Sequence, residues 1–274
     1  MKPTVNNTAF ISVCDYENPH EEASCLLATA DRFGVTIQWA SWGEPWTGFT
    51  SKYIKVLNYL RRIEGYTKYV FFLDCRDVVF IEDVSILLKK FASVHTGGVL
   101  FNASKLDHLY PYREKDLEAT VLRHYSKKEF LNSGCYCGDT VSIERLLVAA
   151  LKLNDDLKRC RSSLPAEIRD VVETQTYAEF KHPCGGELAD DDQFLMHLLQ
   201  TTGRDLVKTD VNCNLFATCR DEYPDIFNPS VLNPDDVRFI GKASILHLPS
   251  LSWRRPEEPN LETYKNWIEN NVLQ

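Results

Sequence analysis

The sequence predicts an α/β fold in which a mixed, mainly parallel sheet is flanked by helices. An unbroken apolar run at residues 69–73 suits a strand buried on both faces, as in a parallel sheet covered by helices. The chain also opens as strand, helix and strand, over residues 10–14, 19–33 and 35–40, which is the unit of such a sheet. Since the 274 residues contain no repeat or low-complexity linker, we expect one domain over residues 1–274.

The remaining elements follow from periodicity and turn residues. Gly34 would end the first helix, whose Ala23, Leu26, Leu27 and Ala30 share one face. Further helices are expected over residues 50–62, 86–91, 143–151, 154–181, 188–199 and 260–273, and further strands over 98–101, 211–216 (a strand or a turn) and 243–248. Residues 106–128 lack a firm pattern, which is typical of a binding loop or lid. The small-residue stretch 130–138 is interpreted as a turn.

Composition excludes several classes of protein. Lys and Arg number 31 against 39 Asp and Glu, giving net charge −8, so the chain is not a general polyanion binder. Its nine cysteines form no C-x-x-C pair, so neither a zinc ribbon nor a thioredoxin-like motif is indicated. The start, M-K-P-T-V-N-N-T, lacks the apolar core of a signal peptide, and no run approaches the ~20 residues of a membrane span. We therefore expect a reduced, cytoplasmic, soluble protein without a membrane partner.

Two carboxylates, Asp74 and Asp77, follow the buried apolar run. Ligands of open α/β sheets collect beyond the carboxyl ends of the strands, where both side chains would lie. Two oxygen donors three positions apart on a turn can hold one Mg²⁺ or Mn²⁺ and leave positions for phosphate oxygens. An enzyme that uses a nucleotide-sugar needs such a site. The alternative is two ordinary acidic residues in a loop.

A turn rich in Gly, Pro and Trp, residues 43–48, precedes the helix at 50–62. The Trp46 indole suits stacking on a uracil ring, although Trp42 and Trp46 packing the loop down explains the composition equally well. Lys52, in the first turn of that helix, is either a phosphate ligand or a solvated side chain.

Three consecutive carboxylates, Asp190, Asp191 and Asp192, open the helix at 188–199. One or two of them suit helix capping, but three exceed what capping needs and favour a functional site. His247 lies near the end of the last strand, where a lone histidine is more often a packed core residue than a ligand.

Taken together, six motifs resemble the glycosyltransferase domain at the N-terminus of the procollagen lysyl hydroxylases, the collagen glucosyl- and galactosyltransferase family. The similarity spans residues 10–254 approximately. In order, the motifs are G-E-P-W-T-G followed by Lys52, L-D-C-R-D-V-V-F with L-L-K-K-F downstream, F-L-N-S-G-x-x-x-G, D-D-D-Q-F, C-N-L-F, and His247 on the last strand. Each motif alone is weak, but six in the same order with comparable spacing form a specific signal.

The resemblance implies a GT-A, Rossmann-like fold that binds a UDP-sugar with Mn²⁺ or Mg²⁺. The positions that match the family's metal ligands are Asp74, Asp77 and His247. The nucleotide-binding positions that it implies are Val13, Trp46, Lys52, Arg76 and Arg254. The positions that match residues facing the sugar and acceptor, and that we expect to be catalytic, are Asn132, Asp191 and Asp192.

The sequence departs from the family at three points. Arg76 stands where the family has an aromatic residue, so a guanidinium would stack on the base or reach the pyrophosphate. After His247 the turn is L-P-S-L-S-W-R rather than Gly-Asn-Gly and Lys, which makes Arg254 the replacement for that lysine. The hydroxylase part is also missing, so the acceptor would be supplied by another molecule.

Three functional hypotheses follow. The first is a metal-dependent enzyme that moves glucose or galactose from a UDP-sugar to a hydroxyl, such as that of hydroxylysine or glycosyl-hydroxylysine, with an Asp from residues 190–192 acting on the acceptor or the sugar ring. The second is a nonenzymatic nucleotide-sugar-binding module. The third is transfer to hydroxymethylated nucleic-acid bases, for which Lys127, Lys128, Arg159 and Arg161 would form a local basic groove.

Overall fold

The computed structural model describes residues 2–104, 130–159, 192–202, 205–218 and 242–248. The centre of the molecule is a six-stranded sheet with the strand order β2-β1-β3-β6-β5-β7. Its strands are β1 (Thr8–Cys14), β2 (Ile37–Trp42), β3 (Tyr69–Leu73), β5 (Val99–Ser104), β6 (Phe130–Asp139) and β7 (Val207–Thr209). Only β6 among them runs antiparallel to its neighbours, so the predicted mixed, mainly parallel sheet is confirmed.

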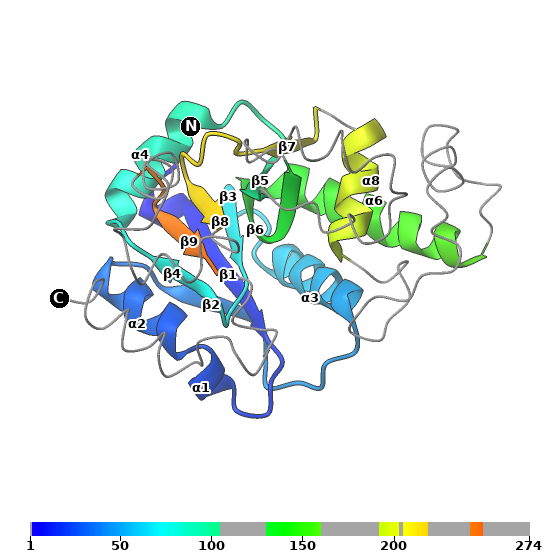
Figure 1. Cartoon of the computed structure of the whole chain (residues 1–274), viewed down its shortest axis with the longest axis horizontal. Helices are drawn as coiled ribbons and strands as arrows, with labels where there is room; N and C mark the ends of the chain where they lie inside the picture. Colours follow the sequence, from blue (N-terminus) through cyan, green and yellow to red (C-terminus); the bar gives the residue numbers. More distant parts are fainter. Residues whose placement is uncertain (1, 105–129, 160–191, 203–204, 219–241, 249–274) are drawn as a thin grey trace, which may run out of the picture.

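Helices cover both faces of this sheet, as Figure 1 shows. One face packs against α3 (Phe49–Arg62), α6 (Thr140–Arg159) and α8 (Asp192–Thr202), and the other against α2 (Ser24–Arg32) and α4 (Val84–Val94). Strand β3 serves both layers because its side chains alternate: Val70 and Phe72 join the first core, and Phe71 and Leu73 join the second. The apolar run therefore forms a strand buried on both faces, as predicted.

A second sheet has three short strands in the order β4-β9-β8. They are β4 (Val78–Phe80), β9 (Ile245–His247) and β8 (Phe216–Thr218). This small sheet shares the core beneath α2 and α4, where the rings of Phe71 and Phe216 lie 6.3 Å apart. Four residues connect β3 to β4, so the chain passes from the large sheet to the small one through the segment 74–77.

Several predicted boundaries differ from those observed. The first helix is divided into α1 (Pro19–Glu22) and α2, and a short 3₁₀ helix, η1 (Val5–Asn7), precedes β1. Helix α4 is longer than expected because the Asp83 side chain caps it by accepting from the Ser85 amide at 2.7 Å. Strand β7 was not predicted, since three residues are too few for a periodic signal.

The interpretation of residues 130–138 as a turn is wrong, because they form β6 in the middle of the sheet. Cys135, Tyr136 and Cys137 are completely buried, so the polar alternation that marks a half-exposed strand is missing. Glycine is needed at the end of β6: a Cβ on Gly138 would lie 2.7 Å from the Gly98 carbonyl oxygen. The small residues reflect close approach of neighbouring backbones rather than a reversal of the chain.

The register between β5 and β6 is interrupted beside the edge where the carboxylates collect. Phe101 pairs with Tyr136, but the next residue, Asn102, pairs with Asn132, so residues 133–135 bulge out of that ladder. The bulge brings Gly134 against β3, where the Asp74 amide donates to the Gly134 carbonyl at 2.8 Å.

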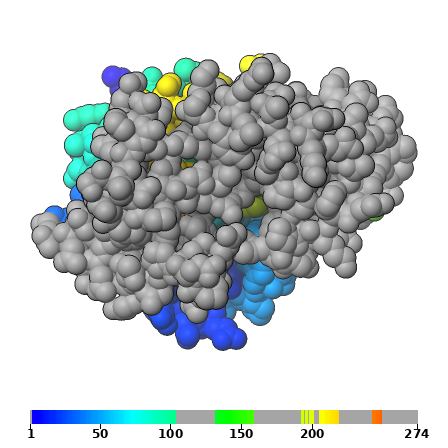
Figure 2. Space-filling view, in the orientation of Figure 1, coloured from blue at the N-terminus to red at the C-terminus, as the bar shows by residue number. Residues whose placement is uncertain are grey.

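Some predicted segments lie outside the described residues, namely 106–128, 160–181, 188–191 and 260–273. Within the described part of the chain, none of the helices combines the length and apolarity needed to cross a membrane. Drawn with all atoms from the same side, the region of α1 and helix α3 reach the surface along the lower rim and α4 along the left rim (Figure 2).

Candidate functional site

Three potential metal ligands meet where the two sheets join. Asp74 follows β3 directly, Asp77 immediately precedes β4, and His247 is the last residue of β9. One ligand atom from each lies within 4.8 Å of the others. The pairing of β4 with β9 sets this geometry, since Val78 pairs with His247 and the Leu248 amide donates to the Asp77 carbonyl at 2.8 Å. Side chains far apart in sequence are therefore brought together.

The cluster has the donors and the space that a divalent cation requires. Nε2 of His247 is buried, makes no hydrogen bond within the described residues and lies 3.5 Å from an Asp77 carboxylate oxygen. A Cβ added to Gly134 would lie 2.6 Å from that nitrogen and 2.8 Å from an Asp74 carboxylate oxygen. Two carboxylates and one imidazole suit Mn²⁺ or another divalent ion with mixed oxygen and nitrogen preference. The residues thus fit a metal, and Gly134 keeps the site open.

Lys52 links this cluster to the start of α8. Its Nζ lies 3.2 Å from the Asp74 carboxylate and 2.6 Å from that of Asp192. Burial lowers the pKa of Lys52, but the carboxylates of Asp192 and Asp74 outweigh this effect and raise it above its usual value. Burial also raises the pKa of Asp74 to about 6, against the opposing effect of the Lys52 charge. A buried ammonium group therefore lies beside the candidate metal ligands, within reach of an anion bound there.

Two of the predicted catalytic residues line the same region. Asp192 is the first residue of α8, is buried, and accepts a hydrogen bond at its backbone carbonyl from the Tyr53 hydroxyl at 2.9 Å. Asn132 lies on β6, and its side-chain oxygen accepts from the Gly134 amide at 3.0 Å. Asn132 thereby stabilises the bulge that brings Gly134 to the cluster. Asp191, with its neighbour Asp190, lies outside the described residues.

The two tryptophans near the predicted nucleotide site behave differently. Trp42, at the end of β2, packs against Trp39 and His20 with ring centroids 4.3 and 4.9 Å away. Trp46 lies in the following loop, is 48% exposed, and touches the edge of Phe49 at 5.4 Å. Of this pair, Trp46 is the more exposed side chain.

Two other predicted nucleotide contacts, Arg76 and Val13, are engaged within the protein. The Arg76 guanidinium pairs with Glu22 at 2.6 Å and lies over the Tyr16 ring at 5.3 Å. Val13 is buried in the core beneath α3, beside a break in the pairing of β1 with β2. Arg254 lies outside the described residues.

A second buried charged group, which sequence reasoning missed, lies at the carboxyl end of β1. Asp15 accepts from the Ser41 hydroxyl at 2.6 Å and pairs closely with Lys55, which also reaches Glu44 at 3.2 Å. Asp15 follows β1 as Asp74 follows β3, so the rule that identified Asp74 also applied to it. The charge of Asp15 is neutralised by Lys55. The ion pairs of Lys55 with Asp15 and Glu44 fix the loop that carries Trp46.

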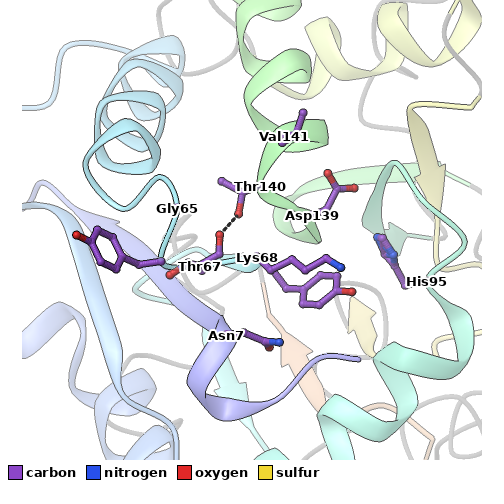
Figure 3. A pocket seen from close by; sticks show the side chains of 10 residues that line it. Asn7, Gly65, Thr67, Lys68, His95, Asp139, Thr140 and Val141 are labelled. Atoms are coloured by element: carbon purple, nitrogen blue, oxygen red, sulfur yellow. Dashed lines mark hydrogen bonds between the residues drawn. The ribbon is translucent and has the colours of Figure 1, made fainter. Parts of the chain in front are cut away.

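A separate hollow of about 600 Å³ lies at the opposite end of the strands, where β3 begins. Figure 3 shows the side chains that line it. Its polar groups are largely used by the fold. The Thr140 hydroxyl donates to the Thr67 carbonyl at 2.9 Å, and the Asp139 carboxylate accepts from the amide and hydroxyl of Ser142. The cluster of Asp74, Asp77 and His247 is therefore the stronger candidate for chemistry.

Comparison with known proteins assigns the family. The sequence profile of the PLOD GT domain matches residues 15–158, which is more than half of the chain. The chain belongs to the PLOD GT domain family. It is thus a glycosyltransferase domain related to that of the lysyl hydroxylases, as the motifs indicated. No curated protein matches it.

The PLOD GT match covers the part of the chain from the end of β1 through nearly all of α6. It includes Trp46, Lys52, Asp74 and Asp77, whereas Asp192 and His247 lie beyond it. Those two residues are associated with the site by the geometry alone: Asp192 through Lys52, and His247 through its proximity to Asp74 and Asp77.

Proposed function

We propose that the protein is a metal-dependent hexosyltransferase that moves glucose or galactose from a UDP-sugar to a hydroxyl group of another molecule. The observation that carries this proposal is the convergence of Asp74, Asp77 and His247 beside the buried Lys52. A site that combines metal ligands with a cation suits a diphosphate, because both neutralise its charge. Hydroxylysine-like and glycosyl-hydroxylysine-like acceptors are the classes to test first, since the family modifies them.

Each residue of the cluster has a distinct role in this proposal. Asp74, Asp77 and His247 hold the ion, which when bound would supply charge neutralisation for the departing diphosphate. Lys52 leaves its two carboxylate partners to contact a phosphate oxygen. The residues near it exclude water, since the surrounding strands are almost entirely buried.

The acceptor side of the site is assigned to the start of α8 and to β6. Asp192, with Asp191, orients or deprotonates the acceptor hydroxyl or stabilises positive charge on the sugar ring. Asn132 contacts the sugar or holds Gly134 in place. The burial of Asp192 and its distance of 2.6 Å from Lys52 support a shared site for these groups.

The nucleotide is assigned to the loop after β2. Trp46 stacks on the uracil ring, since its indole is exposed and the loop that carries it is held by Lys55, which pairs with Glu44 of that loop and with Asp15. Val13 and Arg76 line the base or ribose, and Arg254 approaches the pyrophosphate. For Arg76 this requires exchange of its pairing with Glu22 for a nucleotide contact.

We also propose that residues 1–274 form one cytoplasmic transferase domain. A single domain is supported by the common core of the two sheets, to which Phe10 near the start and Ile245 near the end both contribute. A reduced compartment is supported by the cysteines of the described residues, which are all buried and form no disulfide with one another.

The decisive experiment is UDP release from UDP-glucose and UDP-galactose, with and without Mn²⁺ and with candidate hydroxyl acceptors. We expect release to require the metal and to be abolished in Asp77→Asn. The matched control is Asp83→Asn, because Asp83 is an exposed helix cap and asparagine caps nearly as well. Metal-independent release, or equal activity in the two variants, would contradict the proposal.

A second variant separates an enzyme from a binding module. Asp192→Asn keeps the shape of the side chain and removes its charge. Binding of Mn²⁺ and UDP should be retained, while turnover falls by about a hundredfold or more, the scale of a lost general base or charge stabiliser. Full activity in this variant would mean that Asp192 only helps to begin helix α8 and has no catalytic role.

A further inference from the structure

Asn102 is a polar residue in the middle of an apolar strand. It is completely buried between Phe101 and Ala103 on β5, both of which are also buried. The interruption of the β5–β6 register falls between Phe101 and Asn102, and such interruptions redirect side chains next to functional sites. A buried amide requires partners, so its contacts indicate why it is there.

The amide of Asn102 contacts the side of His247 that faces away from the carboxylates. Its Nδ2 lies 3.3 Å from Nδ1 of the imidazole, and both side chains are buried. Two atoms of this pair make no hydrogen bond within the described residues: Oδ1 of Asn102 and Nε2 of His247. Both therefore have hydrogen-bonding or ligand capacity to spare.

The orientation of the amide sets the tautomer of the ring. With Nδ2 toward the ring, Nδ1 must accept, so the neutral imidazole carries its proton on Nε2 and points it toward Asp77, 3.5 Å away. With the amide turned by half a rotation, Oδ1 accepts a proton from Nδ1, and the Nε2 lone pair faces the carboxylates. The two ends of an amide have nearly the same shape, so the change requires no other movement.

We infer that Asn102 is a positioning residue for the metal site and that its amide turns over when a cation binds. In the metal-free protein Nδ2 donates to the ring. In the loaded protein Oδ1 accepts from Nδ1–H and holds Nε2 unprotonated as a ligand. In the change of tautomer, one proton passes from Nε2 to Nδ1 by exchange with water. This inference rests on the metal site proposed above.

Long-range ¹⁵N–¹H spectra of the ¹⁵N-histidine-labelled full chain test the inference directly. The seven histidines are resolved by comparison with His247→Gln, and Zn²⁺ serves as a diamagnetic probe. We expect the His247 signal to change from the Nε2–H tautomer without metal to the Nδ1–H tautomer with metal. A metal-bound ring that still lacks the Nδ1 proton would overturn the inference.

Variants of Asn102 supply a second measurement, with Mn²⁺ affinity followed by the electron paramagnetic resonance signal of the free ion. Asn102→Leu removes the acceptor, so the affinity should fall by about 10–100-fold, the usual effect of losing such a partner. Asn102→Asp offers a better acceptor to Nδ1–H and should retain the affinity. Asn154→Leu, a change at another buried asparagine, on α6, controls for loss of packing and should leave it unchanged.

The outcomes distinguish the role inferred for Asn102 from the proposed metal site on which it rests. Failure of the wild-type protein to bind Mn²⁺ would overturn the metal site itself. Normal Mn²⁺ binding by both the wild type and Asn102→Leu would overturn only the role of Asn102. If Asn102→Leu does not fold, the tautomer in the wild-type spectra decides.

Discussion

Gly134 leaves space that no other residue type would leave. Its position is fixed by the Asp74 amide on one side and the Asn132 side chain on the other. A β-carbon there would lie closer than van der Waals contact distance to both the Asp74 carboxylate and the His247 ring. The glycine therefore belongs to the metal site, although it contributes no ligand atom.

Gly134→Ala is expected to lower Mn²⁺ affinity at least about tenfold, since the methyl group displaces two ligands. Overpacking should also cost about 1–3 kcal/mol in the free energy of unfolding. Titration with Mn²⁺ and denaturant unfolding measure the two effects separately. Gly65→Ala is the control, because Gly65 has a positive φ of 85° but open space around it, so alanine strains the backbone without touching the site. Equal Mn²⁺ affinities in the two variants would show that the contact is absorbed by movement of the side chains.

Trp46→Ala should weaken UDP binding by about 1–3 kcal/mol, the scale of stacking between a base and an aromatic ring. Calorimetric titration with UDP in the presence of Mn²⁺ gives this value. Trp42→Ala provides the contrast, since its ring packs against Trp39 and His20 and its loss should lower stability instead. A fall in stability without a fall in UDP affinity for Trp46→Ala would make that residue structural.

The sequence was sufficient to single out Asp74 and Asp77, but not the residues that approach them in the fold. Asp74 and Asp77 follow an apolar run, and that signal is local. The approach of His247 depends on the pairing of β4 with β9, so only the resemblance to a family singled it out. Asn102 had a local signal, an amide in an apolar strand, but its partner is 145 residues away and is set by tertiary structure.

Helix α3 connects the two strand ends that carry buried carboxylates. Lys52 and Lys55 are three positions apart, so they lie on neighbouring parts of one helix face. Lys52 reaches Asp74 after β3, and Lys55 reaches Asp15 after β1. The helix thus neutralises acidic groups at two adjacent strand ends of the sheet.

Removing the charge at Lys52 should have opposite effects on stability and metal affinity. In Lys52→Met, the carboxylates of Asp74 and Asp192 lose a buried partner, which should cost about 3–5 kcal/mol in the free energy of unfolding without metal. Mn²⁺ affinity should rise on the order of tenfold, because a competing cation next to Asp74 is gone. UDP affinity should fall, since the proposed phosphate contact is lost. Thermal unfolding and separate Mn²⁺ and UDP titrations measure these changes.

Two further variants test whether these effects belong to Lys52 in particular. Lys55→Met should destabilise the protein without raising Mn²⁺ affinity, because Lys55 pairs with Asp15 and Glu44 rather than with the metal ligands. Adding Asp192→Asn to Lys52→Met should recover part of the lost stability, since an unpaired buried charge is removed. A lower Mn²⁺ affinity in Lys52→Met would mean that Lys52 supports the metal ligands rather than competing with the ion.

At the scale of elements, local pattern predicted β3 and α3 well but missed β6 and β7. Strand β3 and helix α3 were found within a residue of their limits, because an apolar run and helical periodicity are both local signals. Strand β6 carries Asn, Ser and Gly, which favour turns by composition. Its pairing with β3 and β5 provides the hydrogen bonds that override this tendency, and a single sequence does not display them.

The whole molecule brings two sheets together at one point. Asp74 belongs to the end of the large sheet, whereas Asp77 and His247 belong to the small one. The shared core joins the sheets on one side of this point, through contacts such as Phe71 with Phe216. A cation held by all three ligands would join them through a second, polar connection.

Metal binding should therefore slow backbone hydrogen exchange in both sheets at once. We expect Mn²⁺ with UDP to protect peptides that cover β3, β4 and β9 together, because a ligand that binds only the folded arrangement raises the free energy of every opening that separates its contacts. Peptides from α4 that do not contact the site provide an internal reference. Asp77→Asn should remove the protection from all three strands, since it deletes a ligand between the sheets. Protection limited to β3 would place the ion on the large sheet alone and exclude His247 as a ligand.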